Sequence, residues 1–204
     1  VNCILLDRLS NSFELGIYSK GASITQYLWQ IPMLFSTVVF SRSATTKNDK
    51  LFSYKVAQLL RVSLLVISVL SIFLWLLSDL IIVGMYGEEF RGSISVMNYL
   101  LPGVLILTIY KVMNMDLAGR GKPWIATWAM LPSLILNVLL NLYLIPEYGA
   151  NGAAISTTMS YSLAGILFLY FYASTVDIPV KEILNYKKTD FNPIFLIFKK
   201  IISS

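Results

Sequence analysis

A single lysine, Lys111, lies within a long apolar stretch at residues 94–117. Thr108 and Asn114 stand three residues to either side of it, so the three side chains share one face of a helix. An ammonium group in apolar surroundings can hold an anionic group that has left water, which makes Lys111 a candidate binding residue, with Thr108 and Asn114 beside it. The alternative is that its four-carbon stem carries the ammonium group to the nearest water interface.

Polar side chains also recur at helical spacing in three other apolar stretches. These stripes are Ser23, Gln26, Gln30 and Thr37 in the first stretch, Arg61, Ser68, Ser71, Trp75 and Ser78 in the second, and Ser133, Asn137 and Asn141 in the fourth. Amides and hydroxyls can pair with the polar groups of a ligand, and the ring of Trp75 offers a surface for stacking. The stripes therefore predict a polar cavity between helices. The alternative is that they form hydrogen bonds from one helix to the next.

Five apolar stretches must position these side chains. They lie near residues 21–41, 62–86, 94–117, 124–146 and 150–174. About 20 helical residues cross a hydrocarbon core of roughly 30 Å, and each stretch has that length. The composition, 56% hydrophobic and only 13% charged residues, exceeds what a soluble domain of 204 residues normally carries. The sequence therefore predicts an all-α, polytopic membrane helix bundle.

Small residues form two lines along the last apolar stretch. The lines are Ala150, Ala154 and Thr158, and Gly152, Ser156 and Ser160. Such lines let helix backbones approach closely, so we expect them to be packing seams.

The basic residues alternate between the gaps that separate the stretches. Twelve of the sixteen fall in the gap after the first stretch, in the gap after the third, or in the tail; they are Arg42, Lys47, Lys50, Lys55, Arg61, Arg120, Lys122, Lys181, Lys187, Lys188, Lys199 and Lys200. The opposite gaps hold Arg8, Lys20 and Arg91. Because an excess of Lys and Arg marks the cytoplasmic side, the C-terminus should be cytoplasmic. The net charge of +5 is then a feature of membrane topology rather than of nucleic-acid binding.

The two ends of the chain, unlike its middle, lack an apolar stretch long enough to span a bilayer. We expect residues 1–20 to be the end of a truncated helix followed by an outward loop, because Val1–Leu6 is too short to span a bilayer. We expect residues 175–204 to form a basic amphipathic tail on the anionic inner leaflet, with a disordered tail as the alternative. Asp79 and Asp116, near the ends of stretches, are expected to be interfacial or capping groups.

Several motifs along the chain resemble one transporter family. The motifs occur in the order and at the spacing found in polysaccharide flippases; they are residues 15–19 (LGIYS), 29–32 (WQIP), 40–43 (FSRS), 86–90 (YGEEF), 119–123 (GRGKP) and 137–154 (NVLLNLYLIPEYGANGAA). These flippases, which include O-antigen transporters, belong to the multidrug/oligosaccharidyl-lipid/polysaccharide exporter superfamily.

The resemblance implies a transporter of twelve helices in two six-helix lobes, of which this chain would be the C-terminal lobe with its first helix truncated. Such proteins move undecaprenyl-pyrophosphate-linked oligosaccharide across the bacterial cytoplasmic membrane by alternating access, for surface polysaccharide biosynthesis. The expected partners are then the lipid-linked oligosaccharide, membrane lipids, the missing N-terminal lobe and other polysaccharide-assembly proteins. In that setting Lys111 would meet the pyrophosphate.

Two other classes of function remain as alternatives. An ion-coupled multidrug antiporter of the same superfamily should carry a carboxylate near the middle of the membrane, and the five stretches have none there. A membrane-embedded glycan polymerase or ligase would need clustered acid and base groups. The chain has no histidine and one cysteine, which excludes histidine-dependent catalysis and an intramolecular disulfide. We expect no catalytic residue, no metal site and no cofactor.

The charge asymmetry predicts that Arg120 and Lys122 face the cytoplasm while Glu88 and Glu147 face outward. Single cysteines at these positions, in a background without Cys3, can be treated on intact cells with a thiol reagent that does not cross membranes. Positions 88 and 147 should be labelled and positions 120 and 122 protected. Labelling at 120 with protection at 88 would reverse the orientation.

Overall fold

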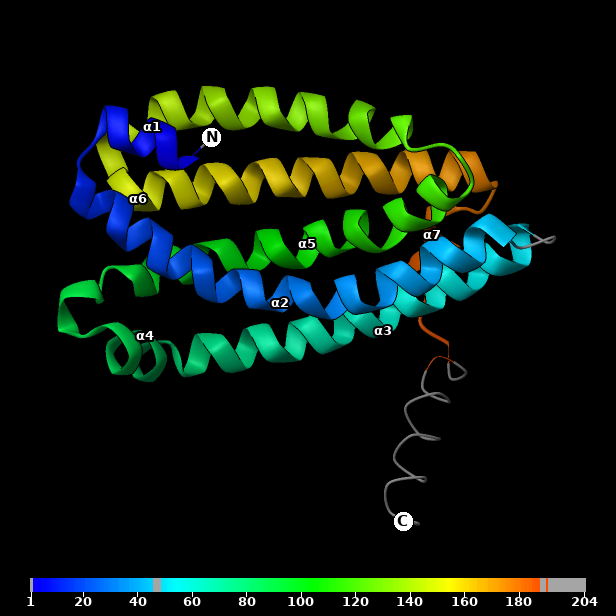
Figure 1. Ribbon diagram of the computed structural model, residues 1–204, viewed down its shortest axis with the longest axis horizontal. Coiled ribbons are helices and arrows are strands. Elements are labelled where there is room, and N and C mark those ends of the chain that lie inside the picture. The colour runs from blue at the N-terminus through cyan, green and yellow to red at the C-terminus, as the bar shows by residue number, and fades with distance from the viewer. Residues whose placement is uncertain (1, 46–48, 188–189, 191–204) are drawn as a thin grey trace, which may run out of the picture.

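The computed structural model describes residues 2–45, 49–187 and 190, apart from the side chains of 35–38 and 49. Its elements in chain order are α1 (Asn2–Leu9), α2 (Ser12–Thr45), α3 (Asp49–Leu76), α4 (Ser78–Tyr86), the 3-10 turn η1 (Glu88–Phe90), α5 (Ser93–Gly119), α6 (Trp124–Val176) and α7 (Val180–Leu184). The described residues contain helices and no strand, and the long helices lie side by side in one bundle (Figure 1). The predicted all-α membrane helix bundle is confirmed.

The helix α5 lies at the centre of the bundle, between α2 and α6 (Figure 1). Glycines allow this close approach. A Cβ atom added at Gly103 would lie 2.7 Å from the Cα of Thr158, and one added at Gly119 would lie 2.6 Å from the carbonyl oxygen of Phe40. Thr158 belongs to one of the predicted seams of small residues, so the backbones of α5 and α6 meet where the sequence placed a packing line.

The helix α6 is a hairpin of two antiparallel limbs rather than one rod (Figure 1). Its backbone turns at Gly149, where φ is 53° and ψ is −128°, a conformation that L side chains rarely adopt. The carboxylate of Glu14 secures the turn, because its Oε2 accepts a hydrogen bond of 2.7 Å from the backbone N–H of Ala150. The two limbs correspond to the predicted stretches 124–146 and 150–174.

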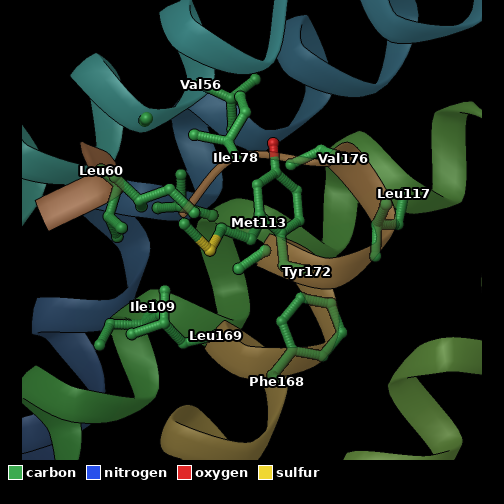
Figure 2. Close-up of a cluster of buried hydrophobic side chains, with 14 of the residues drawn as sticks. Val56, Leu60, Ile109, Met113, Leu117, Phe168, Leu169, Tyr172, Val176 and Ile178 are labelled. Carbon is green, nitrogen blue, oxygen red and sulfur yellow. The ribbon is translucent and has the colours of Figure 1, made fainter. Parts of the chain in front are cut away.

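The largest buried cluster lies where α3, α5, the second limb of α6 and α7 converge (Figure 2). Leu60, Met113 and Phe168 are fully buried there, with Tyr172 beside them. The segment that follows α6 contributes Ile178 and Ile183 to the same cluster.

The outer surface of the bundle is apolar, as a lipid-facing surface must be. Leu34, Ile72, Leu80 and Ile135 are among the large hydrophobic side chains that remain more than half exposed. Three helices are long and apolar enough to cross a membrane within the described residues: Lys50–Leu76, Ser93–Gly119 and Trp124–Val176. The last has 53 residues and turns at Gly149, so each of its limbs approaches the length of one span.

The helices extend beyond the apolar stretches and differ from the predicted bounds in three places. The predicted outward loop within residues 1–20 is instead largely helical, because α2 already begins at Ser12. The third helix begins at Asp49, ahead of the predicted start at 62, and the predicted stretch 62–86 is interrupted at Leu77. Most of the tail predicted over 175–204 lies outside the described residues, which include α7 and Asp190 from it.

The loops gather at two opposite ends of the bundle. The start of α2, η1 and the Gly149 turn lie at one end, while the α2–α3 and α5–α6 junctions and α7 lie at the other (Figure 1). This is the grouping that the predicted topology requires, because it separates the gaps rich in Lys and Arg from those that are not.

Arg61 anchors the end of the chain to α3. Its guanidinium group donates two hydrogen bonds to the Asp190 carboxylate, of 2.7 and 2.8 Å, and one of 2.7 Å to the carbonyl of Ile183. Both side chains are almost completely buried, and the paired guanidinium group lowers the pKa of the Asp190 carboxyl. The segment after α6 is therefore held against α3 by a bidentate ion pair.

The glycine contacts of α5 predict a clear difference between two substitutions. Gly165→Ala should destabilise the bundle by about 1–3 kcal/mol, because the new Cβ would lie 2.5 Å from the carbonyl oxygen of Ile106. Gly84→Ala is the matched control, since nothing lies within 4 Å of its Cβ position. Replacing a glycine within a helix should there be neutral or stabilising by up to about 1 kcal/mol. Unfolding of the purified chain in detergent measures both, and equal effects would contradict the proposed role of Gly165.

Candidate substrate cavity

A cavity of about 860 Å³ opens between α2 and α6, with α1 and α5 completing its walls. Gln26 on α2 and Leu131 and Leu134 on the first limb of α6 line the cavity and are also exposed, so the opening lies between these two helices. A volume of this size lies within the range of pockets that bind small molecules.

One wall of the cavity is a network of amides and hydroxyls. Asn2 donates a hydrogen bond of 2.7 Å to the hydroxyl of Tyr18 and also contacts the hydroxyl of Thr157. On the other side, Asn141 donates to the Oδ1 atoms of Asn2 and Asn137, at 2.8 and 3.0 Å. The network joins α1, α2 and both limbs of α6, so the wall is held in place by the same bonds that connect the helices.

The facing wall is aromatic. Trp29 packs against Tyr161 with ring centroids 5.5 Å apart, and both side chains line the cavity together with Tyr110. The indole Nε1 of Trp29 is buried and has no hydrogen-bond partner among the described residues.

Lys111 lies against Trp29, which lines the cavity. Its Nζ lies 4.6 Å from the centroid of the Trp29 ring, a cation–π contact, and the side chain is half-buried. Lys111 does not itself line the cavity.

The predicted site residues divide between the cavity and its surroundings. Gln26 and Asn137 line the cavity, with Ser23 and Ser133 from the same stripes, and Asn141 bonds to Asn137. Gln30, Thr108 and Asn114 do not line it: Gln30 is exposed, and Thr108 is buried and donates to the carbonyl of Val104. The Oδ1 atom of Asn114 is buried without a partner among the described residues. The side chain of Thr37 lies outside the described ones.

Two predicted site residues lie on other surfaces. Arg61 is held in its ion pair with Asp190, away from the cavity. Trp75 projects from α3 with 57% of its side chain exposed, on a helix that contributes nothing to the cavity wall. The helical spacing of this stripe was read correctly, but the face it occupies turns away from α1 and α6.

Four residues of the cavity lie outside the predicted polar stripes. Asn2 lies in a segment too short to span, and Thr157 belongs to neither predicted packing seam. Tyr18 and Trp29 fall within motifs of the family resemblance, which assign them no place in a cavity. Contacts across the bundle bring these residues to the cavity wall.

A second polar cluster surrounds Asp116 at the end of α5. The fully buried carboxylate accepts hydrogen bonds of 2.9 and 3.0 Å from Arg120 and one of 2.6 Å from the hydroxyl of Tyr172. The hydroxyl of Ser43 also contacts it, and Arg120 donates to the hydroxyl of Ser53 at 2.8 Å. The sequence predicts that Asp116 is an interfacial or capping group near the end of its span, and the structure shows in addition that its buried carboxylate joins α2, α5 and α6. Asp79, by contrast, is exposed and lies 3.3 Å from Arg91.

The comparisons with known proteins point to transporters. Residues 26–199 match the family model described as Lipid II flippase MurJ. The low-salt glycan biosynthesis flippase Agl15 of Haloferax volcanii is 25% identical over 172 residues, which cover 81% of this chain and 36% of that protein. An O-antigen transporter of Shigella flexneri is 24% identical over 169 residues, covering 82% of this chain and 40% of the transporter.

A more distant relative is the multidrug export protein MepA of Staphylococcus saprophyticus, 25% identical over 114 residues, which cover 50% of this chain and 25% of that protein. The chain spans less than half the length of each of these three relatives. No solved structure matches the chain.

The Asp116 cluster predicts a large effect of a nearly isosteric change. Asp116→Asn should destabilise the bundle by about 3–5 kcal/mol, because it leaves the largely buried guanidinium group of Arg120 without its counter-ion. Asp177→Asn is the control, since that carboxylate pairs with Lys50 on the surface with 93% of its side chain exposed, and should change stability little. Detergent-phase unfolding of the two variants gives the comparison. Similar losses of stability in the two variants would show that burial of the Asp116–Arg120 pair does not determine the size of the effect.

Proposed function

Because the chain belongs to the lipid II flippase MurJ family, we propose that it is the translocating lobe of a flippase for undecaprenyl-pyrophosphate-linked oligosaccharide. The lipid carrier would stay in the bilayer while its headgroup crosses through the cavity by alternating access. The products would supply surface polysaccharide biosynthesis. The family match shows the class of protein. We propose the headgroup, the lipid carrier and the pathway in addition.

The observation that carries the proposal is the polar wall of the cavity inside an otherwise lipid-facing bundle. A sugar hydroxyl moved into hydrocarbon without a partner costs several kcal/mol, so a translocation path must replace its water. The amides of Gln26 and Asn137 and the hydroxyl of Ser133 offer both donors and acceptors for this exchange.

We propose that Trp29 stacks on the sugar ring, the role that the sequence suggested for Trp75. Its indole lies in the cavity wall beside Tyr161 and would offer a stacking surface to a sugar ring. Lys111, on the far side of that indole, would neutralise the pyrophosphate as the headgroup passes. Sugar and pyrophosphate would then be recognised by adjacent side chains on α2 and α5.

The complete transporter that we propose has twelve helices in two six-helix lobes, with this chain as the second. It would lie in the bacterial cytoplasmic membrane with its C-terminus in the cytoplasm, alongside other polysaccharide-assembly proteins. The aligned residues cover 36% and 40% of the named flippases, which is compatible with one lobe of such a protein.

The similarity to MepA favours a multidrug antiporter as the second candidate. An antiporter for cationic drugs needs a carboxylate that the transported cation can reach. Among the described residues, no carboxylate lines the cavity, and Asp116 is already neutralised by Arg120. We therefore rank the flippase first.

Charge at position 111 should matter for transport if Lys111 meets the pyrophosphate. Lys111→Arg should keep much of the activity of the full-length protein, whereas Lys111→Gln should lose most of it at unchanged abundance in the membrane. Complementation of surface-glycan assembly in a flippase-deficient strain measures both variants.

The control is Gln30→Ala, on the neighbouring α2 and exposed outside the cavity, which should complement fully. A Lys111→Gln protein that complements as well as the parent would show that Lys111 serves only to anchor its helix at the interface.

A further inference from the structure

A second hollow, of about 450 Å³, lies between the end of α2 and the beginning of α3. Its lining consists of Val39, Arg42, Thr45, Phe52, Lys55, Val56 and Leu59, none of which lines the larger cavity. Gly119 packs against Phe40 and Ser43 on the same part of α2, which places this hollow at the end of the bundle where the basic residues gather.

Two positive charges line this hollow without a counter-ion. Arg42 and Lys55 are exposed, and neither has an ion-pair or hydrogen-bond partner for its side chain among the described residues. The other two arginines at this end differ, because Arg61 is paired with Asp190 and Arg120 with Asp116. The charge on Arg42 and Lys55 is therefore available to an external anion.

The floor of the hollow is apolar. Val39 and Val56 are buried, and Phe52 and Leu59 are partly buried beside them. Thr45 adds a hydroxyl that now donates weakly to carbonyls of its own helix, at 3.2 and 3.4 Å. A ligand that suits these walls carries an anionic group next to a hydrocarbon segment.

We propose that this hollow binds the headgroup phosphate of an anionic phospholipid of the adjoining leaflet. The phosphate lies between Arg42 and Lys55, and the glycerol and first acyl carbons lie against Phe52, Val56 and Leu59. Basic residues at the end of a membrane helix attract anionic lipids, and a hollow with an apolar floor adds selectivity for a lipid over a free ion. The lipid would bridge α2 and α3 across their junction.

The experiment measures phosphatidylglycerol retained by the full chain in detergent micelles, by native mass spectrometry across a lipid titration. Arg42→Gln and Lys55→Gln should each weaken retention about fivefold, and the double variant roughly 25-fold, as expected for about 1 kcal/mol for each basic residue. Lys122→Gln is the matched control, because it removes one exposed charge from the same end outside the hollow and should leave retention unchanged. Thermal unfolding checks that each variant is folded. If the double variant does not fold, the two single variants still test the proposal.

Two further comparisons decide whether the bound phosphate belongs to an anionic lipid. Phosphatidylcholine should be retained far more weakly than phosphatidylglycerol, and inorganic phosphate should not displace the bound lipid. Equal retention of both lipids, displacement by inorganic phosphate, or a loss in Lys122→Gln as large as in Arg42→Gln would each overturn the assignment. None of these measurements depends on transport, so they stand apart from the test of flippase activity.

Discussion

The close approach of α5 to its two neighbours is the constraint on which the rest of the structure depends. In lipid there is little hydrophobic gain from bringing helices together, so contact between backbones must replace it. Gly103 and Gly119 on α5, Gly21 on α2 and Gly165 on α6 each place a neighbouring helix where even a methyl group would not fit. These contacts occur toward both ends of α5, and they fix the positions of α2 and α6.

The cavity follows from this arrangement. With α5 fixed behind it, the space left between α2 and the first limb of α6 is lined by side chains, among which polar groups such as Gln26, Ser133 and Asn137 stand beside apolar ones. The bonds from Asn2 to Tyr18 and from Asn141 to Asn137 satisfy some of these groups within the bundle. Others, such as the Trp29 N–H, have no partner among the described residues. A wall in which some polar groups lack a hydrogen-bond partner is suited to a polar ligand that binds and is then released.

Much of the fold could be predicted from the sequence, because length and hydropathy are strong signals in membrane proteins. The stretches 124–146 and 150–174 appear as the two limbs of α6, and the resemblance to polysaccharide flippases is confirmed by the family match. The interruption at Leu77 could not be predicted, since the apolar run continues through it. Hydrogen bonds also persist across it, from Leu77 to Phe73 and from Ile81 to Leu77.

The site was harder to predict than the spans. Spacing identifies which residues share a helix face, but not which neighbour that face meets. Gln26 and Asn137 lie in the cavity, while Arg61 and Trp75, chosen by the same rule, lie elsewhere: Arg61 pairs with Asp190, and Trp75 is exposed on α3. The placement of Asn2 and Trp29 depends on contacts between residues more than 100 positions apart, which a single sequence does not reveal.

The central claim, that the cavity receives the headgroup of a lipid-linked oligosaccharide, is tested most directly by photo-crosslinking in cells. A photoreactive amino acid at position 26 projects into the cavity, and one at position 72 projects from the exposed face of α3. Lipid-linked oligosaccharide should be captured at position 26 and not at position 72. Capture at neither position, or equally at both, would contradict the account.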